Sequence, residues 1–380
     1  MKILFAGTNV PNEIEYRTKN ISAAGNRFQN NMLAVMRQQG VDVYNLAYLA
    51  IPMENSSLNE IRENHSESYA FIAKQECGHG SAGILKAVRA YRRILKEHVG
   101  EADAVMCYNV NYAWLNLPTI AKQHKKKSVL ILADYSGPEC FRSIRGKVYA
   151  YAMKRAIRRF DIVVGLSSKV KDILKPDQKF MLMEGGIDEA FYHEFDHLDK
   201  VETQEVSKKE YRIMYSGLLS KVTGVDQLLD IMDQVTEQRK DFRLVISGKG
   251  DLEELILEKQ KTRPWLDYVG HLPYQQYIEE LKKADLLVNP RNMDLPENNN
   301  NYPSKILDYL ATGKPILSTM FSGWEGYTDL LFFSPIDGWP SLIAQMELGI
   351  RDDKAMNKRR KRAEAYLWEE QVSRIFRLLG

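Results

Sequence analysis

The sequence has few cysteines, and their number and spacing exclude several kinds of site. The 380-residue chain has three, Cys77, Cys107 and Cys140, which lie far apart. An odd number of widely spaced cysteines does not fit a disulfide framework or a cysteine-rich metal site. It favours a reducing compartment such as the cytoplasm, because disulfides persist mainly in secreted proteins.

Long hydrophobic runs and a large excess of one charge are also missing. No apolar run approaches the roughly 20 residues of a bilayer-spanning helix, and the opening MKILFAG is too short for a secretory signal. The net charge is +3, too near balance to favour nucleic acid as the main partner. We therefore expect a soluble, cytoplasmic chain without a nucleic-acid partner.

Hydrophobic residues make up 44% of the sequence, which is enough to form two cores in a chain of this length. In the first half, short apolar runs alternate with helical spacing. The strand-like runs are KILFAG (2–7), VDVYNLAYL (41–49), ADAVMCY (102–108), SVLILAD (128–134) and DIVVGLS (161–167). This alternation predicts βαβ units and a mostly parallel sheet.

The same pattern restarts after a charged segment, residues 191–210, which we interpret as a connector between domains. The later strand-like runs are RIMYSG (212–217), FRLVISG (242–248), DYVG (267–270), DLLVNP (285–290) and PILST (315–319). The sequence thus predicts an α/β protein with two Rossmann-like domains, residues 1–190 and 211–363. Ligands of such sheets bind beyond the carboxyl ends of the strands, so we expect a site in a cleft between the domains.

The segment YPSKILDYLATG (302–313) has the pattern of an anion-binding helix. At about 100° per residue, Lys305 and Asp308 fall on one side and the apolar residues on the other. Pro303 suits the first helical position because it lacks an N–H group. The free N–H groups of the first turn, together with Lys305, would bind an anion. Alternatively, this is a surface helix with a solvated Lys305–Asp308 ion pair.

Glycine turns follow three predicted strands of the second half. They contain Gly217, Gly248-Lys249-Gly250-Asp251 and Gly270-His271. Glycine lets backbone approach a ligand closely, although βα turns also use it for geometry alone. Together with the Lys305 helix, the three turns indicate a phosphate-bearing ligand. Arg291, directly after DLLVNP, would add a bidentate donor, or is an exposed loop arginine.

Several segments resemble family 4 glycosyltransferases, which have the GT-B fold. ISGKGDLEELI, YVGHLPYQQYIEELKKADLLVNPR and YPSKILDYLATGKPIL resemble the nucleotide-sugar half of that family. MEGGID (183–188) resembles its segment at the interdomain joint, and SAAGNRFQNNMLAVMRQQGVDV its acceptor-side glycine loop. YLWEEQVSRIF resembles its C-terminal helix, so residues 364–380 would cross back onto the first domain.

The resemblance implies transfer of a sugar from a nucleotide diphosphate, UDP or GDP, to a hydroxyl group with retained anomeric configuration. No metal or other cofactor is expected, because protein cations and helix N-termini stabilise the leaving pyrophosphate. The acceptor would be a glycan, or a lipid-linked or protein-linked group, in bacterial surface polysaccharide or glycolipid synthesis. Such an enzyme could touch the inner face of an anionic membrane.

The resemblance also implies roles for individual residues. Asp308 would bind the ribose hydroxyls, and Lys305 and Arg291 the pyrophosphate. The remaining donor-side candidates are Gly217, Lys221, Gly248, Lys249, Gly250, Asp251, His271, Asn300, Asn301, Tyr302, Pro303 and Ser304. The acceptor-side candidates are Gly25, Asn26, Asn109 and Tyr135, and the candidate catalytic residues are Asp134, Arg291 and Lys305.

The sequence departs from the family pattern at three places. Asn300 occupies the position of the first Glu of E-x7-E, and Leu218 and Thr223 occupy those of an Arg and a Lys, which leaves Lys221 as the nearest cation. The usual histidine falls near Asp134, which becomes the candidate at the reacting centre or else caps the next turn. A non-catalytic subunit that stabilises a partner transferase would show the same departures.

Other motifs carry less weight. HEFDH (193–197) matches the zinc-protease pattern, but it lies in the charged connector, so we do not expect a zinc site. The basic runs at 125–127, 142–159 and 358–362 are solvated surface or hold the chain loosely to anionic lipid. The basic residues of 142–159 are spread around the helical wheel. This distribution does not predict an amphipathic membrane helix. Asn298 and Asn299 are interpreted as plain loop.

Overall fold

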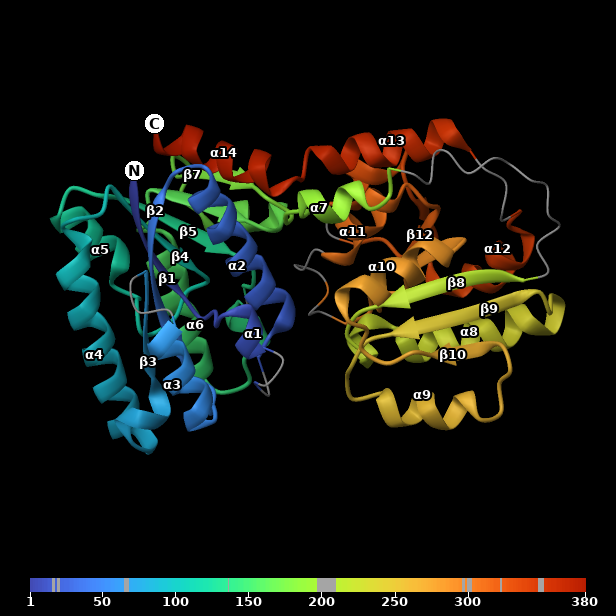
Figure 1. Ribbon diagram of the computed structural model, residues 1–380, viewed down its shortest axis with the longest axis horizontal. Helices are drawn as coiled ribbons and strands as arrows, with labels where there is room; N and C mark the ends of the chain where they lie inside the picture. The colour runs from blue at the N-terminus through green and yellow to red at the C-terminus, as the bar shows by residue number, and fades with distance from the viewer. Residues whose placement is uncertain are drawn as a thin grey trace. The chain divides into compact units, whose positions relative to one another are not determined.

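The computed structural model describes residues 1–15, 18, 21–64, 68–135, 137–196, 210–295, 298, 303–321, 323–347 and 352–380. The chain divides into two compact units (Figure 1). The first consists of Met1–Gly186 with Trp368–Gly380, and the second of Ile187–Leu367. None of the described helices has the length and hydrophobicity needed to cross a membrane.

The described part of the first unit contains a parallel sheet in the order β3-β2-β1-β4-β5-β6-β7. Its strands are β1 (Lys2–Gly7), β2 (Asp42–Leu49), β3 (Tyr69–Ala73), β4 (Ala104–Tyr108), β5 (Lys127–Leu132), β6 (Ile162–Gly165) and β7 (Lys179–Leu182). The central strands are continuous apolar runs because helices cover both faces of the sheet. The predicted parallel α/β sheet is confirmed.

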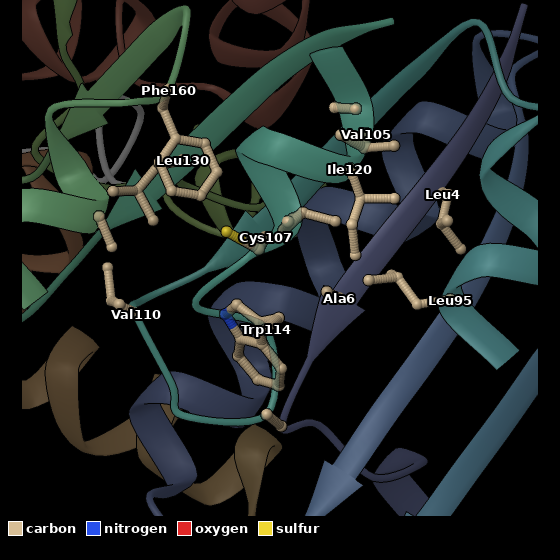
Figure 2. Packing of buried hydrophobic residues seen from close by; sticks show 14 of the residues in the cluster. Leu4, Ala6, Leu95, Val105, Cys107, Val110, Trp114, Ile120, Leu130 and Phe160 are labelled. Carbon is tan, nitrogen blue, oxygen red and sulfur yellow. The ribbon is translucent and has the colours of Figure 1, made fainter. Parts of the chain in front are cut away.

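Two sets of helices cover the faces of this sheet. The helices of the unit are α1 (Asn12–Glu15), α2 (Ala23–Gln38), α3 (Asn55–Asn64), α4 (Gly80–Val99), α5 (Leu117–Gln123), α6 (Ile144–Ile157) and α14 (Trp368–Leu379). Helices α4, α5 and α6 share one core with the sheet, and α2 and α14 share another. Figure 2 shows Cys107 of β4 and Trp114 inside the first of these cores.

The C-terminal helix α14 belongs to the first unit, which takes in residues 368–380 where the resemblance implied 364–380. Trp368 at its start is buried and lies against Gly186, where a Cβ atom would come within 2.2 Å of the indole. Phe28 of α2 packs edge-on against the same ring, with the ring centroids 4.9 Å apart. Only glycine at 186 leaves room for this contact, so the glycine pair in MEGGID positions the returning helix.

The second unit contains a parallel sheet in the order β10-β9-β8-β11-β12-β13. Its strands are β8 (Tyr211–Ser216), β9 (Phe242–Ser247), β10 (Leu266–Tyr268), β11 (Leu286–Asn289), β12 (Ile316–Ser318) and β13 (Phe332–Phe333). Its helices are α7 (Glu189–His193), α8 (Val225–Gln238), α9 (Glu253–Gln260), α10 (Tyr274–Lys283), α11 (Lys305–Thr312), α12 (Trp339–Gln345) and α13 (Asp353–Glu364). Helices α8, α9 and α12 share one core, and α7, α10, α11 and α13 the other.

The expected connector, residues 191–210, differs from what the structure shows at its start. Phe191, Tyr192 and Phe195 are buried in the core of the second unit, and helix α7 covers Glu189–His193. Three aromatic side chains on one helical face make this segment part of the unit despite its charged residues. Residues 197–209 lie outside the described part of the chain.

Candidate functional site

The helix with the expected anion-binding pattern is α11, and its first turn differs from the prediction. Pro303 lies two residues before the first helical residue, Lys305. The N–H groups of Ile306 and Leu307 donate to the carbonyls of Pro303 and Ser304 at 2.9 and 3.1 Å. The amides of Ile306 and Leu307 are therefore bonded within the turn. The prediction that they are free for a ligand is wrong. The charged group of this turn that could bind an anion is the Lys305 ammonium.

The Lys305 side chain turns toward the carboxyl end of β8. Its Nζ lies 3.8 Å from the centroid of the buried Tyr215 ring, a cation–π contact. The same Nζ is 3.0 Å from the position that a Cβ atom would take at Gly217. The ammonium thus lies between an aromatic face and a glycine turn, and the alternative of a solvated ion pair with Asp308 is not observed.

The electrostatics of this position disfavour a positive charge. Desolvation lowers the pKa of Lys305 well below its ordinary value, and the nearby Arg291 guanidinium lowers it further. Burial also lowers the pKa of Arg291. Within the described part of the chain, no carboxylate forms an ion pair with Lys305. Two cations therefore lie close together where strands β8 and β11 end, and an anionic ligand would relieve their repulsion.

The glycine turns of this unit pack against one another. The Gly217 N–H donates to the Ser247 carbonyl at 3.0 Å, and the Gly248 N–H to the Gly270 carbonyl at 2.9 Å. A Cβ at Gly248 would lie 1.8 Å from the Gly217 carbonyl oxygen, and φ at Gly248 is 147°. Glycine at 248 is therefore required by turn packing itself. Lys249 and Asp251 of the same turn are exposed.

Where the family pattern has a lysine, Thr223 closes the loop after β8. It is buried, and its Oγ1 lies 2.7 Å from the Leu218 carbonyl oxygen and 2.8 Å from that of Ser220. Leu218, at the position of the family arginine, is 59% exposed. Lys221 is exposed in the same loop. The loop is thus stabilised by a hydroxyl group and presents one flexible cation.

The asparagine run contains a structural residue that the sequence did not reveal. Asn298 is fully buried, and its Nδ2 donates to the carbonyls of Val222 and Asn292 at 2.7 and 2.6 Å. It joins the loop after β8 to the loop after β11, so its interpretation as plain loop is wrong. The candidates Asn300, Asn301 and Tyr302 lie outside the described residues.

Two more donor-side candidates come from α11 and from the residues after β10. Asp308, in the first turn of α11, is half-buried and accepts a hydrogen bond of 3.3 Å from the Tyr277 hydroxyl. His271 is exposed after β10. An acidic residue in a first turn also interacts favourably with the helix dipole.

In the first unit, Asn109 and Asp134 form a cluster at the carboxyl ends of β4 and β5. Asn109 has a left-handed φ of 54°, which asparagine tolerates better than most residues. Its Oδ1 accepts from the N–H groups of Ala133 and Asp134 at 2.7 and 3.0 Å, and its Nδ2 donates to Asp134 Oδ2 at 3.2 Å. This arrangement fixes an exposed carboxylate at the strand end.

The sequence analysis missed Tyr108, which adjoins this cluster. Tyr108 is buried, and desolvation and the charge of Asp134 raise its pKa. Its hydroxyl lies 3.3 Å from the position of a Cβ atom at Gly25. The candidate Gly25 is thus placed near Asp134, and Tyr135 is half-buried beside it in sequence. A buried tyrosine at a strand end gives no signal in the sequence beyond that of a core residue.

Asn26 has a different environment from the one expected for an acceptor-binding residue. It is buried, its Oδ1 accepts from the Val10 N–H, and its Nδ2 donates to Glu15 Oε2, both at 2.7 Å. These bonds tie the start of α2 to the loop after β1. The amide is therefore engaged within the protein.

The HEFDH segment places one histidine beside a carboxylate. His193 Nδ1 lies 2.7 Å from Asp196 Oδ2, and both side chains are exposed. Within the described part of the chain, no three histidine, cysteine or acidic residues gather as metal ligands. His197 lies outside that part.

Comparison with known proteins finds a family match within the second unit. Residues 198–329 match the family described as glycosyl transferases, group 1. Over 198 residues the chain is 23% identical to a GDP-mannose-dependent α-(1-6)-phosphatidylinositol dimannoside mannosyltransferase of Mycobacterium tuberculosis. That match covers 51% of this chain and 50% of the relative, so the chain spans about half the length of the curated relatives it matches.

Two solved structures resemble the whole chain. HepE of Anabaena, in complex with UDP, superposes with a TM-score of 0.68 at 14% identity, with 99% of each chain covered. The pneumococcal O-GlcNAc transferase GtfA, in complex with UDP and GlcNAc, gives 0.67 at 10% identity, with 100% of this chain and 98% of the other covered. At such identities the likeness shows the fold, which is GT-B. The chain thus has the GT-B fold, and its residues 198–329 match the group 1 glycosyl transferases.

Proposed function

We propose that the chain transfers a sugar from a nucleotide diphosphate to a hydroxyl acceptor, with retained configuration and without a metal ion. The observation that carries this proposal is the Lys305 ammonium, desolvated over Tyr215, close to Arg291 and without a carboxylate partner in the described part of the chain. A diphosphate would supply negative charge beside the Lys305 ammonium.

In the proposed reaction the donor binds at the strand ends of the second unit. Lys305 and Arg291 stabilise the charge that grows on the diphosphate as the glycosidic bond breaks. Asp308 binds the ribose hydroxyls. One donor phosphate oxygen takes the proton of the acceptor hydroxyl, and the acceptor attacks from the face that the diphosphate leaves.

The acceptor side of the proposal rests on the first unit. Asn109 holds Asp134 at the end of β5 by hydrogen bonds to its backbone and its carboxylate. A carboxylate in that position would orient an acceptor hydroxyl or stabilise positive charge on the sugar ring. The proposed acceptor is a glycan or a lipid-linked or protein-linked sugar in bacterial surface polysaccharide or glycolipid synthesis.

Calorimetric titration with UDP and with GDP tests the donor site. We expect saturable binding of one of the two, and a loss of about 100-fold or more in Lys305→Met, because a charge-assisted contact is removed. The control is Lys261→Met, which removes the same charge from an exposed position of the same unit and leaves the affinity unchanged. Equal affinities in both variants would contradict the role of Lys305.

A second candidate is a non-catalytic subunit that stabilises a partner transferase. Thr223 favours this candidate, because its hydroxyl bonds to loop carbonyls at the position where the family pattern has a lysine. The charge of that lysine is therefore missing from the site. The two candidates differ in a nucleotide-sugar panel scored by release of the nucleotide diphosphate. Binding of UDP or GDP without release from any donor, across a set of acceptors, would favour the non-catalytic subunit.

A further inference from the structure

Helix α6 exposes an apolar stripe to solvent. Ile144 is 82% exposed, Val148 62% and Tyr151 63%. Their spacing of four and three residues places them within about 60° of one another around the helix. A monomeric protein rarely aligns large apolar side chains in this way without a partner. The opposite side of α6 packs into the core of the first unit through Ala156 and Ile157.

Basic residues flank this stripe on both sides. Seven Lys or Arg residues and no acidic residue occur from Arg142 to Arg159. By helical spacing, Lys147 and Lys154 fall on one side of the stripe and Arg145 on the other. Their long side chains can bury their methylene groups against an apolar layer and keep the charge in a polar one. Arg155 is exposed and falls in line with the stripe, one turn beyond Tyr151. The stripe itself contains no basic residue.

The basic run at 358–362, in α13, is different. Arg359 and Arg360 are buried and donate to backbone carbonyls, among them those of Gly313 at 3.1 Å and Ala311 at 2.8 Å. Lys358 pairs with Asp329 at 2.7 Å. These charges stabilise the carboxyl end of α11 and its surroundings. The expectation that this run contacts lipid is therefore wrong for its arginines at 359 and 360.

We propose that α6 lies in the interface of an anionic membrane, with Ile144, Val148 and Tyr151 at the acyl boundary and the flanking bases among the headgroups. An apolar stripe bordered by cations matches the two layers of such an interface. A second copy of the chain fits this face less well, because pairing α6 with itself would bring four basic residues against four. No carboxylate of the helix offsets that repulsion.

The position of α6 in the unit connects the membrane to the acceptor side. The helix follows β5 in the chain, and the connection between them, residues 133–143, starts at the end of the sheet where Asp134 lies. A membrane bound at Ile144 and Val148 would therefore hold a lipid-linked acceptor near that sheet edge. This last step rests on the proposed function, whereas the membrane contact itself does not.

Cosedimentation with vesicles tests the proposal. The probes are vesicles of phosphatidylcholine alone and of phosphatidylcholine with phosphatidylglycerol, at low and at high salt. Wild type should bind the anionic vesicles and not the neutral ones. The variant Arg145→Gln/Lys147→Gln/Lys154→Gln should bind about 100-fold more weakly, since each base near an anionic surface contributes about fivefold.

The apolar stripe has its own variant and control. Ile144→Ser/Val148→Ser/Tyr151→Ser keeps every charge and should lose at least about tenfold in binding, most clearly at high salt, where screening leaves the apolar part. The matched control is Leu255→Ser/Leu257→Ser, which removes two exposed leucines from α9 and should bind as wild type does. Circular dichroism and UDP or GDP affinity check that each variant is folded.

Three outcomes would overturn the proposal. They are absence of wild-type binding to anionic vesicles, unchanged binding by the serine variant of the stripe, and loss of a dimer in that variant by light scattering. The last outcome would assign the stripe to a second copy of the chain. Normal vesicle binding without sugar transfer would leave the membrane contact intact and contradict only the proposed function.

Discussion

The two sheets of the molecule end in different chemistry. At the carboxyl ends of β8 and β11, the second unit gathers two cations, Lys305 and Arg291, whose pKa values burial lowers. At the carboxyl ends of its own strands, the first unit gathers amides that bond to one another. In the first arrangement an anion would offset the desolvation of Lys305, whereas most of the amides in the second bond to other groups of the protein. The proposed donor site is therefore the easier of the two to recognise.

In the amide network of the first unit, most polar groups bond to one another, and the buried Asn45 Oδ1 is an exception. Asn9 Nδ2 donates to Asn30 Oδ1 at 2.7 Å, and Asn45 Nδ2 donates to Asn9 Oδ1 at 3.2 Å. Gln29 accepts from the Thr8 N–H at 3.0 Å. Such bonds give the loop after β1 a fixed shape, because removing one partner leaves another buried group unsatisfied. Polar residues in this unit thus indicate structure before they indicate binding.

The largest effects should come from two substitutions, Lys305→Ala in the second unit and Asn26→Ala in the first, and they should act on different quantities. Lys305→Ala should lower turnover by about 100- to 1,000-fold, the loss typical of one electrostatic contact to a developing charge. Asn26→Ala should lower the free energy of unfolding by about 2 kcal/mol, because it leaves the Val10 N–H and Glu15 without their partner. Steady-state kinetics and thermal unfolding measure the two effects.

The contrast between the two units would be wrong if Lys305→Ala lowered stability and Asn26→Ala lowered turnover. Lys305→Ala should not destabilise the chain, because the desolvated ammonium opposes folding. Asn26→Ala should keep its turnover per folded molecule. A strong loss of turnover in folded Asn26→Ala would instead assign this amide to the acceptor.

The second prediction concerns the glycine turns of the second unit. Gly248→Ala places a Cβ 1.8 Å from the Gly217 carbonyl oxygen, whereas nothing lies within 4 Å of the Cβ position at Gly270. Both residues have positive φ, so Gly270→Ala measures the conformational cost alone, about 1 kcal/mol. Gly248→Ala should cost about 3 kcal/mol or more in the free energy of unfolding. Similar costs in denaturant unfolding would show that turn packing does not require glycine at 248.

The third prediction concerns the first unit, where Asn109 positions Asp134. Asn109→Gly retains the φ of 54° without strain but removes the bonds to the Asp134 amide and carboxylate. We expect kcat to fall by about tenfold, with a smaller change in KM, because a misplaced group acts mainly on the reacting geometry. Asp134→Asn, the reference variant, should lose more. An unchanged kcat in Asn109→Gly would limit the asparagine to a structural role.

Much of the fold could be predicted from the sequence, and the misses have physical reasons. Both parallel sheets follow from apolar runs that alternate with helical spacing. Strands β3 and β7 gave no such signal, because they lie at the sheet edges and are only partly buried. Helix α6 could not be recognised as amphipathic, since its buried side and its exposed stripe are both apolar.

The candidate site was predictable only in part. Local spacing predicted that Lys305 occupies the first turn of a helix, but not that its ammonium lies over Tyr215, which is distant in sequence. Asn298 was interpreted as plain loop because its partners, Val222 and Asn292, come from loops that only the fold brings together. Contacts between distant segments carry no periodic pattern, so a single sequence does not reveal them.

The smallest predicted effect is a proton linkage at the cationic sheet end. Because the pKa of Lys305 lies well below its ordinary 10.5 in the free protein, a bound diphosphate should raise it and draw a proton onto the amine. Affinity for the nucleotide should therefore be greatest below the lowered pKa, fall as pH rises through it, and level off above the pKa of the complex. The stability of the free protein should change in the opposite sense and rise across the same window, because the unfolded chain holds this proton up to higher pH.

Titration calorimetry in two buffers of different ionisation enthalpy measures this uptake, which is at most about one proton per site. Lys305→Met is the reference, since it retains the proton equilibria of the nucleotide itself and lacks the amine. Uptake that is larger in wild type than in this variant would place the titrating group at Lys305. Equal uptake in both would mean that the ammonium is already fully protonated in the free protein, and that the cationic end of the second sheet is less strained than its contacts with Tyr215 and Arg291 indicate.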